Sequence, residues 1–184
     1  MRILKKVYVL MVMFFISTVV FAQVKAGAVF ENTYPISSYT DLFKSRLGNG
    51  IKVEVPLKIK NIEGLGVCAK YMNGIDIASR PDVCNSYYFS ILAGCYYNIP
   101  IFKAFSFQIE AEYGINDYCG DLIDTQGNLS FFNSLNQIMG VSPALRYDIG
   151  KWSFCLGGNY YVVPQKDSWL NEFGFSLAAI TLCK

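Results

Sequence analysis

The chain has 184 residues, of which 16% are aromatic and 16% are charged, with a formal net charge of +2. This length suits one domain with a sizeable core, and the charged share is low against the roughly 25% of an average globular domain. Histidine is absent, which excludes a Ser-His nucleophile and the usual histidine-containing zinc patterns. The basic residues are scattered, so nucleic acid is not expected as a partner.

The first 22 residues have the pattern of an export signal. Three basic residues among the first six precede an apolar run over residues 7–21, and Val20-Phe21-Ala22 offers small residues where cleavage would occur. The run is shorter than the roughly 20 residues of a transmembrane helix, and an uncleaved anchor is the alternative. We expect a signal peptide over residues 1–22 and one domain over residues 23–184, with 13 basic against 14 acidic residues left from the 16 and 14 of the whole chain.

Residues 24–31 begin the domain with an alternation of apolar and polar side chains. The alternation is most complete over residues 51–60, which read Ile-Lys-Val-Glu-Val-Pro-Leu-Lys-Ile-Lys. A period of two predicts a strand with one oily and one polar face. About ten residues is also the length with which a tilted strand crosses a bilayer. The pattern recurs in further segments, at 65–71, 89–98, 105–113, 139–148, 152–160 and 173–179.

The connections between these segments alternate in length. Long loops are expected over residues 32–50, 73–84, 114–136 and 164–171. Short turns are expected over residues 61–64, around Pro100 and over residues 149–151. The order predicts an all-β fold, an eight-stranded antiparallel up-and-down transmembrane β-barrel with short periplasmic turns and long extracellular loops.

This pattern of strands and loops resembles the small eight-stranded outer-membrane barrels of the OmpA transmembrane domain, OmpX and OmpW kind. The resemblance covers residue 24 to the C-terminus and implies the outer membrane of a diderm, Gram-negative-type bacterium. The chain departs from the family at its end, Thr181-Leu182-Cys183-Lys184, where an aromatic residue is usual. We also expect no added periplasmic domain of the kind found in OmpA-like proteins.

The aromatic residues indicate that the oily face meets lipid. They gather in two groups at the strand ends, as expected of the interfacial girdles of a membrane-spanning barrel. The group beside the short turns is Tyr97, Phe105, Tyr147 and Trp152, and the group beside the long loops is Tyr71, Tyr113, Tyr160 and Phe173. A secreted lipocalin-like barrel that binds an apolar ligand has the same period and is the alternative.

With the oily face outside, the charged residues of the polar face line the lumen. They are Lys25, Glu31, Lys52, Glu54, Lys58, Lys60, Lys70, Glu110, Glu112, Arg146 and Asp148. Both signs are present, so salt bridges that plug the lumen are expected, because an unpaired buried charge costs several kcal/mol. A narrow channel for ions or small solutes is the alternative.

Six cysteines are many for an exported barrel. Cys84 and Cys119 both fall in predicted long loops, where either a loop-to-loop disulfide or two free thiols would fit. The loop acids Asp117, Asp121 and Asp124 lack the spacing of a calcium loop. We expect no metal, no cofactor and no enzymatic activity.

The sequence therefore predicts a monomeric outer-membrane protein with a structural or surface-interaction role. Its expected partners are outer-membrane lipid and an extracellular ligand that contacts the long loops.

Overall fold

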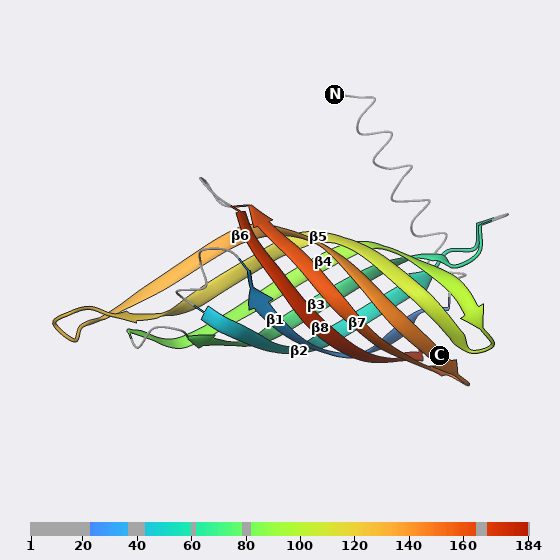
Figure 1. Ribbon diagram of the computed structural model, residues 1–184, viewed down its shortest axis with the longest axis horizontal. Coiled ribbons are helices and arrows are strands. Elements are labelled where there is room, and N and C mark those ends of the chain that lie inside the picture. The colour runs from blue at the N-terminus through green and yellow to red at the C-terminus, as the bar shows by residue number, and fades with distance from the viewer. Residues whose placement is uncertain (1–22, 37–42, 60–61, 79–81, 165–168, 184) are drawn as a thin grey trace, which may run out of the picture.

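The computed structural model describes residues 23–36, 43–59, 62–78, 82–164 and 169–183, and its regular elements are eight strands (Figure 1). The strands are β1 (Lys25–Pro35), β2 (Phe43–Pro56), β3 (Leu65–Ala78), β4 (Val83–Phe102), β5 (Phe105–Ile123), β6 (Leu129–Ile149), β7 (Trp152–Pro164) and β8 (Trp169–Leu182). The predicted signal peptide, residues 1–22, lies outside the described residues.

The strands form one closed barrel in sequence order. Each strand pairs antiparallel with the next, and β1 pairs with β8 from Lys25 opposite Leu182 to Pro35 opposite Glu172. Closure leaves no sheet edge, which is what a sheet in hydrocarbon requires, because there is no water there to satisfy unpaired backbone groups. The predicted up-and-down eight-stranded barrel is confirmed.

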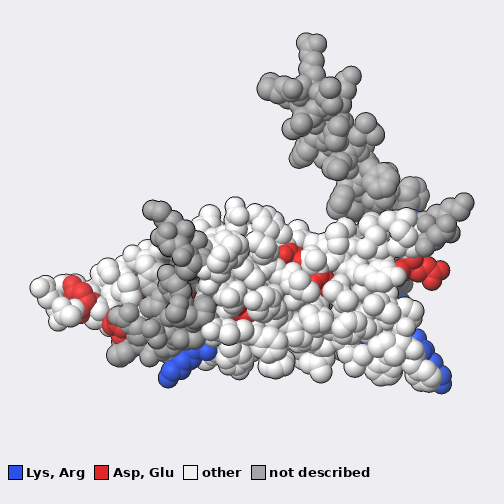
Figure 2. All heavy atoms as spheres, turned by 45° about the horizontal axis from the view of Figure 1, so that its top comes forward, with Lys and Arg blue, Asp and Glu red and all other residues white. Residues whose placement is uncertain are grey.

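Side chains alternate between the interior and the outer surface along every strand. On β5, Glu110 and Glu112 are buried, while Ile109 and Tyr113 beside them are 39% and 54% exposed. Large apolar side chains such as Ile51, Val141 and Leu145 accordingly stand on the outer surface, 59%, 47% and 47% exposed. In the face shown in Figure 2, basic side chains are visible toward the two ends of the long axis, and acidic ones are visible there and as small areas in the middle. Among the described residues, no helix is long and apolar enough to cross a membrane.

The predicted aromatic groups lie on the outer surface. Tyr97, Phe105, Tyr147 and Trp152 near the short turns are 36–49% exposed, and the rings of Phe105 and Tyr147 lie 4.7 Å apart between centroids. Tyr71, Tyr113, Tyr160 and Phe173 are 41–54% exposed.

Strand β2 differs from the predicted strand 51–60 at both ends. It begins at Phe43, inside the predicted loop 32–50, and ends at Pro56. Pro56, which has no backbone N–H to donate to a ladder, is still paired with Gly66, and one further backbone hydrogen bond follows from Leu57 to Leu65.

The predicted long loops are mostly strand. β5 runs to Ile123 and β6 begins at Leu129, so five residues remain of the predicted loop 114–136. These two strands continue beyond their neighbours as a projecting hairpin, which ends at the left of Figure 1. The alternation is lost on the β5 side of this hairpin, where the consecutive residues Asn116, Asp117, Tyr118 and Cys119 are all buried.

The short turns are tight where they are described. Lys103-Ala104 joins β4 to β5, and Gly150-Lys151 joins β6 to β7. Lys103 and Gly150 take positive φ values of 45° and 58°, as the reversal of a two-residue hairpin requires. Pro100, which the sequence places in a turn, lies within β4.

Candidate functional site

The middle of the barrel interior is organised around Lys70 of β3. Its Nζ donates to Glu31 Oε1 at 2.7 Å, to Glu112 Oε2 at 2.9 Å and to Tyr161 Oη at 2.7 Å. Ser142 Oγ also donates to Glu112, at 3.4 Å. One ammonium group therefore ties together two carboxylates and a phenol from β1, β5 and β7, across the full width of the lumen.

A second group lies nearer the short turns and centres on Glu54 of β2, which has no exposed surface. Arg146 Nη1 donates to Glu54 Oε2 at 2.6 Å, and Lys52 Nζ lies 3.1 Å from Glu54 Oε1. Gln108 Nε2 donates to the same Oε1 at 3.1 Å, and Lys52 pairs in turn with Glu110. The charges of Lys52 and Arg146 are thus both shared between carboxylates. Such pairing offsets the desolvation free energy of burying a charge.

The short-turn mouth of the barrel continues this network. Arg146 Nε donates to both carboxylate oxygens of Asp148, at 3.1 and 3.2 Å. Arg146 Nη2 donates to Ser153 Oγ at 2.7 Å, and Lys25 Nζ donates to the same oxygen at 3.0 Å. Lys25 and Asp148 lie 3.6 Å apart and are partly exposed, so the network reaches solvent here.

A third group lies toward the end of the barrel that carries the projecting β5–β6 hairpin. Arg46 of β2 forms ion pairs with Glu172 of β8 and with Asp76 of β3, the latter at 2.7 Å. Tyr118 Oη donates to Glu172 Oε1 at 3.0 Å, and the Arg46 guanidinium lies 4.0 Å from the centre of the Tyr118 ring. A guanidinium at this distance is attracted by the face of the ring.

Small cavities lie between these groups. One interior cavity of about 20 Å³ lies beside Lys52 and Lys70, and another of about 10 Å³ lies beside Arg46 and Tyr161. A cavity of about 10–15 Å³ takes one water molecule. Each of these two spaces therefore has room for about one water molecule.

The structure brings most of the predicted lumen residues together. Those buried inside the barrel are Glu31, Lys52, Glu54, Lys70, Glu110, Glu112 and Arg146. Lys25 and Asp148 lie at the mouth, with side chains 24% and 43% exposed. Lys58 is exposed beyond the end of β2, so its assignment to the lumen is corrected, and Lys60 lies outside the described residues.

Sequence reasoning missed the Arg46 group because its members fall in or beside predicted loops. The signal that could have found Arg46 is the even spacing of the inward face of β2, which continues unbroken from Glu54 and Lys52 back to Arg46. Asp76 continues the inward face of β3 in the same way. It lies two residues beyond Gly74 and four residues beyond Met72. An alternation carried through glycines is easily taken for a loop, because glycine is also a turn residue.

Cys84 and Cys119 lie in β4 and β5, not in loops, and both are free thiols. Cys84 is paired with Asp121 in the ladder, and Cys119 with Tyr87, with an irregular register between the two pairs. The disulfide weighed from the sequence is therefore not formed in the structure.

Cys68, Glu110 and Glu112 come closest to a metal site among the described residues. Their potential ligand atoms lie within 4.8 Å of one another, and all three side chains are buried. Thiolate and carboxylate ligands would suit zinc. However, Lys52 already pairs with Glu110 and Lys70 with Glu112, so a metal ion would have to displace two ammonium groups.

Solved structures of outer-membrane proteins are similar to this chain. Neisserial surface protein A superimposes with a TM-score of 0.61 at 17% identity, over 87% of this chain and 96% of that one. Ail of Yersinia pestis gives 0.52 at 12%, over 86% and 97%. A major outer membrane protein of Thermus thermophilus gives 0.51 at 10%, over 85% and 98%.

These likenesses define the fold: the chain is built as a small eight-stranded outer-membrane β-barrel. The sequence matches no protein-family model and no curated protein.

Proposed function

We propose that the chain is an outer-membrane barrel whose lumen is closed by its own ion pairs and whose role is structural or one of surface interaction. The observation that carries this proposal is the cross-barrel network, in which Lys70, Glu54 and Arg46 each bind residues on several strands. A conducting pore needs a continuous polar path, and an eight-stranded interior is just wide enough for side chains to fill it. Ion-pair groups at successive heights along the barrel support a filled interior.

The proposed location is the outer membrane of a diderm bacterium, reached with a cleaved signal peptide. The basic, apolar and small-residue order of residues 1–22 supports export. The apolar outer surface between two aromatic groups supports insertion into a bilayer. Fractionation tests this: recovery with membranes until detergent is added is expected, whereas recovery in the aqueous fraction would favour the secreted lipocalin-like alternative.

The projecting β5–β6 hairpin is the proposed contact surface for an extracellular partner, presented by a monomeric barrel. The Ail structure is of a complex with the heparin analogue sucrose octasulfate, a polyanion. In this chain the β5–β6 hairpin carries Asp121 and Asp124 near its tip, which would repel such a ligand. We therefore propose a neutral or cationic partner, bound without catalysis.

Planar-bilayer recording tests the closed lumen. The refolded protein is expected to give no steady conductance. A variant in which Glu31, Lys70 and Glu112 are all replaced by alanine removes the middle layer of the network and should conduct. Steady conductance of the unaltered barrel would refute the closed lumen and support the narrow-channel alternative. The matched control replaces the exposed Glu63 and Lys58 by alanine and should stay silent.

A further inference from the structure

The projecting β5–β6 hairpin has an open strand edge on its β6 side. Strand β5 is paired on both sides there, with β4 as far as Val83 and with β6 as far as Leu129. Strand β6, in contrast, pairs with β7 only from Met139 onward. Among the described residues, no strand therefore pairs with the other side of residues 129–138, which run along the upper margin of the hairpin at the left of Figure 1. We call residues 129–138 the open edge.

The hydrogen bonds of the β5–β6 ladder show which residues of β6 face the open side. At one end of the ladder Asp124 N donates to Asn128 O at 3.0 Å, and at the other end Asp148 N donates to Ala104 O at 2.9 Å. The register between these two ends is unbroken. Because hydrogen-bonded pairs alternate in an antiparallel ladder, the even-numbered residues of β6 bond to β5. The backbone N–H and C=O groups of the odd-numbered residues over 129–137 therefore point to the open side.

The large exposed side chains of the open edge belong to the same odd-numbered residues. Leu129, Phe131 and Leu135 are 65%, 63% and 62% exposed, and Asn133 and Gln137 are exposed as well. The open edge contains no charged residue, no proline and no glycine. Lysine, proline and bulges are the usual means by which proteins keep an exposed edge from pairing. An uncharged edge without them is a template for a further strand.

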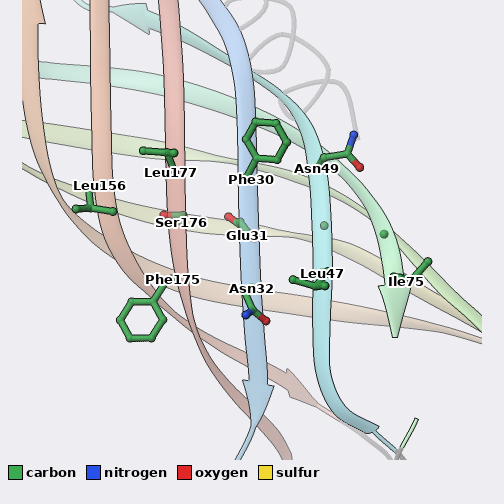
Figure 3. A pocket seen from close by; sticks show the side chains of 12 residues that line it. Phe30, Glu31, Asn32, Leu47, Asn49, Ile75, Leu156, Phe175, Ser176 and Leu177 are labelled. Atoms are coloured by element: carbon green, nitrogen blue, oxygen red, sulfur yellow. The ribbon is translucent and has the colours of Figure 1, made fainter. Parts of the chain in front are cut away.

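The open edge lies beyond the outer surface that meets lipid. On the body of the barrel, Phe30, Leu156 and Leu177 stand on the outer surface (Figure 3), 56%, 62% and 52% exposed. Tyr113, which belongs to the aromatic group beside the long loops, pairs with Met139 in the β5–β6 ladder. The open edge lies on the far side of that pair from the short turns. With the barrel inserted between its two aromatic groups, lipid covers the body of the barrel and leaves the open edge in water.

The open edge is complementary to a second copy of itself. An antiparallel pair with a two-fold axis at Asn133 places Phe131 of each copy opposite Leu135 of the other, and Leu129 opposite Gln137. All of these residues are odd-numbered, so each pair can exchange two backbone hydrogen bonds, about ten in all. Phe131 and Leu135 cover each other, Asn133 meets the same amide, and no like charges are opposed. This is the self-complementarity that a two-fold interface requires.

The direction of the strands fixes where the second copy lies. In an antiparallel pair the two β6 strands run in opposite directions, so the two barrels lie at opposite ends of the paired hairpins. Two barrels in one membrane would need parallel β6 strands. A two-fold axis along parallel strands would bring each N–H opposite the same N–H, and no ladder would form. The second barrel therefore lies in a facing membrane.

We propose that the open edge of β6 pairs with the open edge of a second copy of this chain in a facing membrane, so that the two hairpins join the membranes. The occupant is a second copy because it brings an unpaired strand edge of matching hydrogen-bond pattern and matching uncharged side chains. This inference rests on the proposed function, namely insertion in the outer membrane with the β5–β6 hairpin as the contact surface. Each barrel remains a monomer within its own membrane.

Bridging between two vesicle populations tests the pairing. The full chain is refolded into dense, sucrose-filled phospholipid vesicles and into fluorescent phospholipid vesicles. Sedimentation of the dense vesicles then measures how much fluorescence they carry down. Capture is expected only when both populations hold the chain. Absence of capture, or equal capture of fluorescent vesicles that hold no protein, would overturn the proposal.

Paired charge variants identify the second copy as the partner. Phe131→Lys combined with Leu135→Lys opposes like charges across the two-fold axis and should lower capture about tenfold, as should Phe131→Glu combined with Leu135→Glu. Lysine vesicles mixed with glutamate vesicles should regain capture, because each lysine then faces a glutamate. The control, Tyr87→Lys combined with Ile123→Lys, adds the same charge to exposed positions on β4 and β5 and should leave capture unchanged. Unchanged capture by the lysine variant, or a mixture that regains none, would refute the pairing.

Three checks separate this inference from the proposed function. A chain that does not float with the vesicles refutes the membrane location. A chain that floats, migrates as a folded barrel in unheated gels, is cut by added proteinase K in the turn over residues 124–128 and captures no vesicles refutes the pairing alone. Variants enter the comparison only if they float, migrate and are cut as the unaltered chain is.

Discussion

Replacing Lys70 by methionine should destabilise the barrel more than any other single loss of a lysine. The Lys70 side chain is 2% exposed, and its ammonium group is shared by Glu31 and Glu112 at 2.7 and 2.9 Å. Methionine has nearly the same length but no charge, so it leaves two buried carboxylates without their cation. Removing one partner of a buried ion pair typically costs about 3–5 kcal/mol, and we expect a loss in that range.

Urea titration in lipid vesicles, followed by tryptophan fluorescence and by gel mobility without heating, measures this loss. Lys58→Met is the matched control, because Lys58 is exposed outside the strands, and it should unfold at the urea concentration of the unaltered chain. Adding Glu31→Gln and Glu112→Gln to Lys70→Met should restore most of the stability, since replacing all charges of a buried group is often neutral. If Lys70→Met unfolds like the control, or the triple variant is no better than the single one, the assigned ion-pair network is wrong.

Three further predictions concern the outer surface and the hairpin. Ile51→Arg on β2 should weaken the inserted barrel by about 2–4 kcal/mol in the same titration, whereas Ile62→Arg in the turn should not; equal effects would misplace the lipid face. Hydrogen bonds from the Asn128 side chain and from backbone N–H groups hold the pKa of Asp124 below its ordinary 3.8. The turn over residues 124–128 should therefore persist as the pH falls to about 4 and loosen below the pKa of Asp124. An NMR titration in which the Asn128 amide shifts with a midpoint at or above pH 3.8 would contradict this. Cys95 faces outward, so in vesicles it should resist a water-soluble maleimide that labels Cys183, and equal labelling would place it in water.

The sequence was sufficient to predict the barrel because the bilayer enforces a period of two wherever a strand crosses it. Ile109 and Tyr113 on one side, and Glu110 and Glu112 on the other, must alternate or the strand would not insert. The same reasoning explains where prediction stopped. Beyond Gly114 the alternation of β5 is lost, because Asn116 and Asp117 are both polar and both buried, so they read as a loop although both belong to the strand.

The partners within the lumen could not be predicted, because alternation fixes which face a residue occupies but not its height on the barrel axis. Lys52 of β2 pairs with Glu110 of β5 and with Glu54 of its own strand. Glu112 instead binds Lys70 of β3. The choice depends on the stagger between strands, which is set by the whole closed ladder and leaves no mark in any one segment.

Because of this dependence on stagger, the ion-pair network forms only when the strands pair in the native register. A slip of one residue between two strands would carry their inward charges into lipid and bring apolar side chains into the lumen. A slip of two residues would keep every side chain on its own face but separate Lys70 from Glu31, and Arg146 from Glu54. The apolar surface alone tolerates that second error, because one outward residue there replaces another of the same kind. The buried ion pairs do not, and they therefore select the native register of the closed barrel among those that the bilayer would accept.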